Sequence, residues 1–331
     1  MDAGQLMAIG FDGVAMSPAL RSLITDLHLG GLVLFARNVE SPAQLRQLIR
    51  DAQQVARDAG LPPLFICIDQ EGGRVARLRA KQGFTEFPPA KTMAESGVDA
   101  VRRAATALAG EMRTAGINVD LAPVLDVNNN PANPVIGDRS FGDDAARVAE
   151  CGVAFITAMQ AAGVMCVGKH FPGHGDVAVD SHISLPLVPH LRERLDEVEF
   201  APFKAAIAAG VGGIMSAHVS FPAIEPSGLP ATLSRSVMTT LLRDELGYDG
   251  LLFTDALEMG ALGASGYAVP VAAIMALRAG ADMLLFNSGE ALHRQAHAAV
   301  AAAMRDGELL RARVAGALQH VEAAKLRFDI L

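Results

Sequence analysis

Runs of apolar residues recur along the chain and alternate with longer segments in which apolar positions return every three or four residues. The short runs are almost continuously apolar, which is typical of parallel strands buried on both faces. They occupy residues 5–11, 31–35, 64–69, 118–123, 165–170, 212–218, 250–255 and 281–286. The pattern therefore predicts eight strands.

The longer segments carry the start and stop signals of helices. Ser17-Pro18 and Ser41-Pro42 each place a capping residue before a proline, which favours a helix start at that point. Gly60 follows one such segment and favours its end. The predicted helices cover residues 44–59, 101–115, 144–161, 192–209, 235–246, 269–279, 292–304 and 309–325.

Strands that alternate with helices eight times predict an α/β fold, a single (β/α)8 TIM-like barrel, and 331 residues suit such a barrel with loop insertions. A doubly wound open sheet is the alternative, but no GxGxxG motif follows the first strand. No linker rich in Ser, Gly or Pro divides the chain, so we expect one domain over residues 1–331. In this architecture the active site lies at the C-terminal ends of the strands.

Composition narrows the class of protein. A hydrophobic content of 51% with 19% charged residues indicates a well-buried globular chain. The net charge of -8 and the lack of a basic stripe argue against nucleic acid or an anionic membrane surface as a partner. Three cysteines without CxxC spacing indicate neither a disulfide framework nor a structural zinc site.

The N-terminal sequence has no basic start and no small-residue cleavage pattern. No apolar run approaches the roughly 20 residues of a membrane span. We therefore expect a cytoplasmic protein, and we expect it to be a monomer.

The segment 165–182 is unusually dense in titratable side chains. Such groups are costly to bury unless they pair with one another, with a ligand or with a metal. Its glycines and proline prevent a continuous helix, so the segment is predicted to be a shaped loop that leaves the end of the fifth strand. The titratable residues are Lys169, His170, His174, Asp176, Asp180 and His182.

Polar residues also follow the other predicted strands. Some have plain structural explanations: Arg74 and Asp138 can pin a loop through a salt bridge, and His218 can be a buried core histidine. Their joint position at one end of the barrel is what indicates an active site. The residues are Asp69, Glu71, Arg74 and Arg77 after strand three, Asp126, Asp138 and Arg139 after strand four, His218 after strand six, and Asp255 and Glu258 after strand seven.

Two mechanisms fit these residues. His170, His174, Asp180 and His182 are possible metal ligands, but Lys169 would put a cation beside the metal.

The alternative is a carboxylate nucleophile with a separate proton donor. Asp255 follows an apolar strand and is suited to covalent attack. Asp180-x-His182 supplies a histidine polarised by an aspartate, which suits acid/base catalysis.

These residues form motifs that resemble glycoside hydrolase family 3. The motifs are DQEGGR at 69–74, GDRSFG at 137–142, KHFPGHGD at 169–176, DSH at 180–182 and TDAL at 254–257. The DSH element is similar to that of the β-N-acetylhexosaminidase branch, the NagZ type that acts in peptidoglycan recycling. The resemblance runs from about the first strand to the eighth.

The resemblance implies roles for individual residues. Asp255 is the expected nucleophile, and His182 is the expected acid/base with Asp180 as its partner. The matched sugar-binding positions are Asp69, Arg77, Arg139, Lys169 and His170. The family implies removal of a terminal β-linked N-acetylglucosamine from a muropeptide of the GlcNAc-1,6-anhydroMurNAc type, with retention of configuration. It implies no metal and no organic cofactor.

Three other functions fit the same residues. The chain can be a β-glucosidase of this family, or a phosphorylase in which phosphate replaces water as the acceptor. It can also be a sugar-binding barrel without catalysis, although Asp180, His182 and Asp255 are all present. A pure binder does not need a nucleophile.

Overall fold

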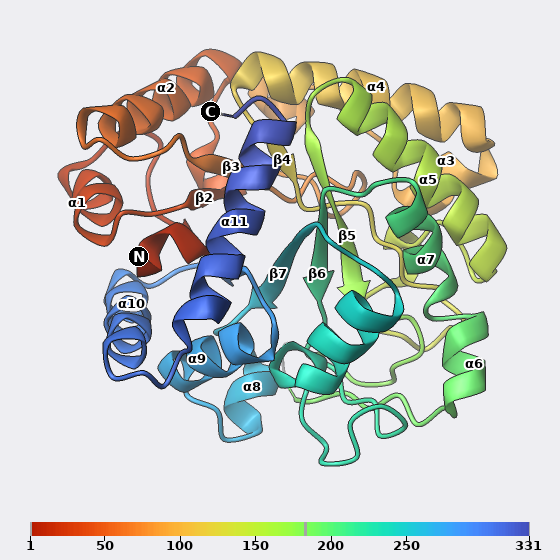
Figure 1. Cartoon of the computed structure of the whole chain (residues 1–331). Coiled ribbons are helices and arrows are strands. Elements are labelled where there is room, and N and C mark those ends of the chain that lie inside the picture. The colour runs from red at the N-terminus through yellow and green to blue at the C-terminus, as the bar shows by residue number, and fades with distance from the viewer. Residues whose placement is uncertain (1, 182–183, 331) are drawn as a thin grey trace.

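The computed structural model describes residues 2–181 and 184–330, in which eight parallel strands close into a barrel, each paired with its sequence neighbours and β1 with β8 (Figure 1). This arrangement confirms the predicted (β/α)8 barrel. The strands are β1 Met7–Gly10, β2 Gly31–Leu34, β3 Phe65–Ile68, β4 Val119–Asp120, β5 Met165–Phe171, β6 Gly213–Ser216, β7 Leu251–Ala256 and β8 Met283–Phe286.

Helices surround the barrel (Figure 1). Ser17 and Ser41 cap the first two as predicted, each accepting a hydrogen bond from the backbone three residues ahead. The helices are α1 Pro18–Leu27, α2 Pro42–Asp58, α3 Ala90–Glu95, α4 Val98–Ala115, α5 Ala145–Ala161, α6 Arg192–Glu197, α7 Ala201–Ala208, α8 Gly260–Ala264, α9 Val269–Ala279, α10 Glu290–Arg305 and α11 Arg311–Arg327. Short 3-10 turns are η1 Ala3–Leu6, η2 Ala36–Asn38, η3 Ala80–Gln82, η4 Gly137–Arg139 and η5 Ala231–Leu233.

Three predicted elements differ from the observed ones. Strand β4 stops before Pro123, which has no amide hydrogen with which to continue the ladder. The single helix predicted over 192–209 is divided into α6 and α7, because Pro202 suits only the first turn of a new helix. Residues Ser236–Glu245 (η6) are helical as predicted but form a π-helix. The apolar spacing does not distinguish this form from an α-helix.

The barrel is a packed core. A side chain at Gly213 would collide with Val167 and with the ring of Phe253, which fill the space that the glycine leaves. At the N-terminal ends of the strands, α11 contacts β7 and places the buried Lys325 ammonium 5.1 Å from the centre of the Phe65 ring. None of the described helices combines the length and apolarity that a membrane crossing requires.

Candidate active site

Asp255 lies on β7 near the C-terminal end of the barrel, as predicted. Its Oδ1 accepts a hydrogen bond of 2.7 Å from the backbone of Ala256. His218, which follows β6, is buried and donates from Nε2 to the Ala256 carbonyl at 2.9 Å, while its Nδ1 lies 2.8 Å from Thr232 Oγ1. His218 is therefore a core histidine that also fixes the backbone beside Asp255.

The electrostatic surroundings keep Asp255 ionised. Burial by itself raises the pKa of this carboxyl. The charges of His218 and His170 and the hydrogen bond from Ala256 outweigh burial, so the pKa lies below its ordinary value. A buried but anionic carboxylate is what covalent attack on an electrophilic carbon requires.

A network of buried charges lies at the ends of β3 and β5. Lys169 Nζ contacts Asp69 Oδ1 at 2.8 Å and Glu71 Oε1 at 2.7 Å. Arg139 binds Glu71 through two parallel hydrogen bonds of 2.8 Å. Arg77 reaches Asp69 Oδ2 at 3.2 Å. Each carboxylate therefore binds two cations, which fixes the position of all five side chains.

The pKa shifts in this network agree with its geometry. Burial raises the pKa of the Asp69 and Glu71 carboxyls, but the adjacent cations outweigh it and hold both below the ordinary range. Burial lowers the pKa of Lys169, and the two carboxylates reverse this and raise it. Glu71 orients Lys169 and Arg139, a role that the sequence did not assign although the DQEGGR motif contains the residue.

His170 is oriented by a buried carboxylate. Its Nδ1 lies 2.7 Å from Asp126 Oδ2, and the backbone amides of His170 and His174 donate to the same carboxylate. Burial raises the pKa of Asp126, but the His170 charge and these hydrogen bonds hold it below its ordinary value. Asp126 is thus a positioning residue, recognised from the sequence only as a polar group at a strand end.

The loop after β5 is attached to the barrel at Ser181. The Ser181 hydroxyl lies 3.0 Å from His174 Nε2, and its carbonyl accepts a hydrogen bond from Ala261 N at 3.0 Å. Burial lowers the pKa of His174 to about 4, so this imidazole is neutral at pH 7. Ser181 directly follows Asp180, which borders the active-site cavity. The predicted acid/base His182 lies outside the described residues.

One cavity of about 270 Å³ connects these groups at the C-terminal end of the barrel. A volume of this size suits a single sugar ring better than an extended chain. Every predicted site residue within the described part of the chain lines it: Asp69, Arg77, Arg139, Lys169, His170, Asp180 and Asp255.

Two further lining residues show how the cavity wall is held. Phe35, which lies in none of the sequence motifs, also lines the cavity. The guanidinium carbons of Arg37 and Arg77 lie 4.4 Å and 5.5 Å from the centre of its ring. Arg74 binds Asp138 at 2.9 Å and also donates to the carbonyls of Val135 and Ile136. These bonds hold the loop after β4 in place, which is the structural role considered for Arg74 and Asp138 from the sequence.

The contacts of the possible metal ligands in the active site bear on the metal mechanism. His170 and His174 each use one ring nitrogen for a protein partner. The Lys169 ammonium lies within the cluster of charged groups beside His170, where it disfavours a second cation. Among the described residues a metal-like spacing of ligands occurs elsewhere, at Asp176, His190 and Glu199.

Comparison with known proteins shows the family. The model of the glycosyl hydrolase family 3 N-terminal domain matches residues 1–324. The chain is 43% identical over 286 residues to beta-hexosaminidase A of Pseudoalteromonas piscicida, covering 82% of this chain and 48% of that protein. It is 40% identical over 297 residues to a beta-hexosaminidase of Alkalilimnicola ehrlichii, covering 87% of this chain and 82% of that protein. The chain thus spans about half the length of the first of these relatives.

Solved structures of similar proteins support the same family. A family 3 β-N-acetylglucosaminidase from Paenibacillus sp. matches with a TM-score of 0.97 and 46% identity over 99% of this chain and 62% of its own. A β-N-acetylhexosaminidase from Beutenbergia cavernae matches with a TM-score of 0.90 and 32% identity over 98% of this chain and 97% of its own. The chain therefore belongs to glycosyl hydrolase family 3.

Proposed function

We propose that this protein is a retaining exo-β-N-acetylglucosaminidase that removes a terminal β-linked N-acetylglucosamine from muropeptides. The observation that carries the proposal is an ionised Asp255 in a cavity the size of one sugar ring, which the Asp69–Lys169 pair also lines. Relatives that share this barrel bear the names β-N-acetylglucosaminidase and beta-hexosaminidase. The muropeptide, a role in peptidoglycan recycling and a cytoplasmic location remain predictions from the sequence.

In the first step the Asp255 carboxylate attacks the anomeric carbon. The bond to the leaving oxygen breaks, and His182 donates a proton to that oxygen while Asp180 stabilises the imidazolium. In the second step His182 removes a proton from water, the water oxygen attacks the anomeric carbon, and Asp255 is released. Two inversions give net retention of configuration.

The charge network suits the sugar-binding half of the site. Asp69 is fixed by Lys169 and Arg77, so its oxygens are held in place to accept bonds from sugar hydroxyls. Arg139 and Lys169 are held by Glu71. Groups that are fixed before the substrate arrives lose little conformational entropy on binding.

The decisive experiment compares hydrolysis of an aryl β-N-acetylglucosaminide with that of an aryl β-glucoside, with and without phosphate. We expect a clear preference for the N-acetyl sugar, no glycosyl phosphate, and a first-formed product with the β configuration. Mass measurement of protein quenched during turnover should show one added sugar, which Asp255→Ala removes.

Other outcomes would redirect the proposal. Preference for the glucoside would make the chain a β-glucosidase, and phosphate-dependent product would make it a phosphorylase. If the wild-type protein neither bound nor hydrolysed either substrate, the catalytic role would be contradicted altogether. If it bound a sugar without turnover, the chain would be a sugar-binding barrel.

A further inference from the structure

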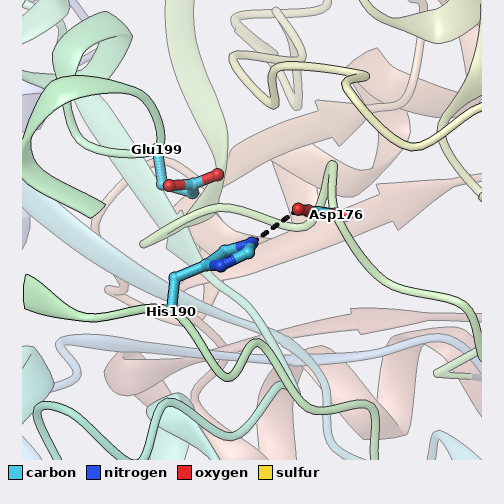
Figure 2. Close-up of side chains that lie close together, drawn as sticks. All are labelled: Asp176, His190 and Glu199. Carbon is cyan, nitrogen blue, oxygen red and sulfur yellow. Dashed lines mark hydrogen bonds and ion pairs between the residues drawn. The ribbon is translucent and has the colours of Figure 1, made fainter. Parts of the chain in front are cut away.

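Three side chains with metal-binding atoms converge outside the active-site cavity (Figure 2). Asp176 lies in the loop after β5, His190 precedes α6, and Glu199 lies between α6 and α7. One ligand atom of each lies within 4.8 Å of the other two, and His190 Nε2 is 2.6 Å from Asp176 Oδ2. None of the three lines the cavity that contains Asp255.

The group combines a buried member with two accessible ones. The side chain of Glu199 is 3% exposed, while those of Asp176 and His190 are 25% and 31% exposed. An ion can therefore enter from solvent and reach the Glu199 carboxylate, which is held rigidly. Arg194 binds Glu199 Oε2 at 2.7 Å, but a carboxylate has two oxygens and can keep this partner while it offers the other.

The second oxygen of Glu199, Oε1, has only a distant hydrogen-bond donor among the described residues. Asn129 donates to Glu199 Oε1 only at 3.4 Å. The amide oxygen of Asn129 is buried and has no hydrogen-bond partner among the described residues. A polar oxygen without a donor, next to a buried carboxylate, is the environment that a cation satisfies.

We propose that Asp176, His190 and Glu199 bind a divalent transition-metal ion of the zinc class. One imidazole with two carboxylates suits zinc, manganese or cobalt better than calcium or magnesium, which prefer oxygen ligands alone. Ligands at about 2.0–2.1 Å from a tetrahedral ion lie about 3.3 Å apart. The pair of Asp176 and His190 needs to open by less than about 1 Å, and Glu199 to approach by about 1.5 Å, to reach this geometry. The site leaves a fourth position for water.

The position of the site gives the metal a structural role. The loop that carries Asp180 is already joined to the segment before α6 by the bond between Asp176 and His190, and the metal would also join it to the connection between α6 and α7 through Glu199. Asp176 stands four residues before Asp180 in the chain. The bound ion would restrict the loop without touching the substrate. The inference does not depend on the proposed reaction.

Cobalt is the best probe, because a Co²⁺ ion with nitrogen and oxygen ligands in a tetrahedral site absorbs visible light. We expect chelator-treated wild-type protein to bind one equivalent of Co²⁺ with such absorption, and zinc to abolish it. Zinc should also raise the unfolding temperature, since a ligand that binds only the folded state stabilises it.

Variants locate the site. His190→Ala and Asp176→Asn should weaken cobalt and zinc binding by roughly a hundredfold or more, because even groups that only orient metal ligands are worth about 10- to 100-fold in affinity. Both positions are partly exposed, so both variants should fold. The matched control is His28→Ala, which breaks another histidine–aspartate pair, that with Asp2; among the described residues this pair has no third ligand atom within the 4.8 Å that separates the atoms of Asp176, His190 and Glu199.

Two results would overturn the proposal. Absence of cobalt absorption and of a zinc-dependent shift in the wild type would mean that His190 serves only as a hydrogen-bond partner of Asp176. Binding that survives His190→Ala would place the metal elsewhere, for instance at the histidines of the active site.

Discussion

Buried ion-pair clusters occupy both ends of the barrel, and they differ in what lies beside them. At the C-terminal end, Lys169 and Glu71 belong to the network that borders the cavity. At the opposite end, Asp282, fully buried and directly before β8, binds Arg243 at 2.6 Å and Arg313.

In the second cluster the central carboxylate, that of Asp282, is fully buried. Asp282 Oδ2 also accepts from the backbone of Leu252 at 3.0 Å, and His320 lies 3.1 Å from Oδ1. These bonds join β7 and β8 to η6 and α11. The same kind of charge cluster therefore contributes to stability around Asp282, whereas at the C-terminal end of the barrel it borders a cavity in which a ligand can be recognised. Removing one partner of such a pair is costly in both places.

The largest effect is expected at Asp255, in the open end of the barrel. Asp255→Ala removes the nucleophile and should reduce kcat by about 10⁴-fold or more, the scale seen when a covalent nucleophile is deleted. The unfolding temperature should stay close to that of the wild type, because among the described residues the hydrogen bond that the carboxylate accepts comes from the backbone of Ala256 and joins no other element. Calorimetry of the variant tests this, and loss of a cooperative transition would contradict it.

His182→Ala should give the next largest effect, and a selective one. Loss of a proton donor typically costs about 10²- to 10⁴-fold. The loss should be near this for substrates with poor leaving groups and small for activated aryl glycosides, whose leaving oxygen needs no proton. Equal losses on both substrate types would remove the acid/base assignment.

A matched pair of variants tests the comparison of the two ends directly. Asp282→Asn and Glu71→Gln each remove the charge from a carboxylate that binds two cations. Each should lower the free energy of unfolding by about 3–5 kcal/mol. Only Glu71→Gln should also raise KM, because it frees Lys169 and Arg139. A raised KM for folded Asp282→Asn would mean that the ends are not separate.

Lys325 at the closed end gives the smallest effect. Its Nζ has no hydrogen-bond partner among the described residues, and burial lowers its pKa to about 8. Between this value and the ordinary 10.5 of lysine the unfolded chain binds more protons, so stability rises with pH across that window, and the full penalty applies below it.

Lys325→Met should remove this penalty. At pH 7 we expect a gain of about 1–3 kcal/mol in the free energy of unfolding, and a flatter profile between pH 8 and 10.5. Lys91→Met, at an exposed lysine, is the control and should leave the profile unchanged. Chemical denaturation at several pH values measures both, and a destabilised Lys325→Met would show that the ring of Phe65 compensates for burial.

Local signals made the barrel predictable. The apolar runs and the caps at Ser17 and Ser41 depend on residues close in sequence, and they located the strands and the starts of the first helices. The division at Pro202 was also visible in principle, because proline marks a first turn. The π-helical form of η6 was not, since α- and π-helices bury similar faces.

The residues of the site were predictable from the sequence, but the hydrogen bonds that hold them in place were not. The motifs identified the lining residues of the cavity. They did not reveal that Asp126 holds both His170 and the backbone of His174, or that Ser181 is fixed by α8. Those contacts join segments distant in sequence and depend on the closed barrel.

The depth of the Lys169 network has a consequence for the solutions in which the protein can work. The Lys169 side chain is 2% exposed and that of Glu71 is 3% exposed, so dissolved ions cannot come between them. Salt weakens only charges that face water, over a screening length of about 8 Å at 0.15 M. The affinity for an uncharged sugar should therefore change little between dilute buffer and concentrated brine, while the exposed ion pairs of the surface lose their attraction.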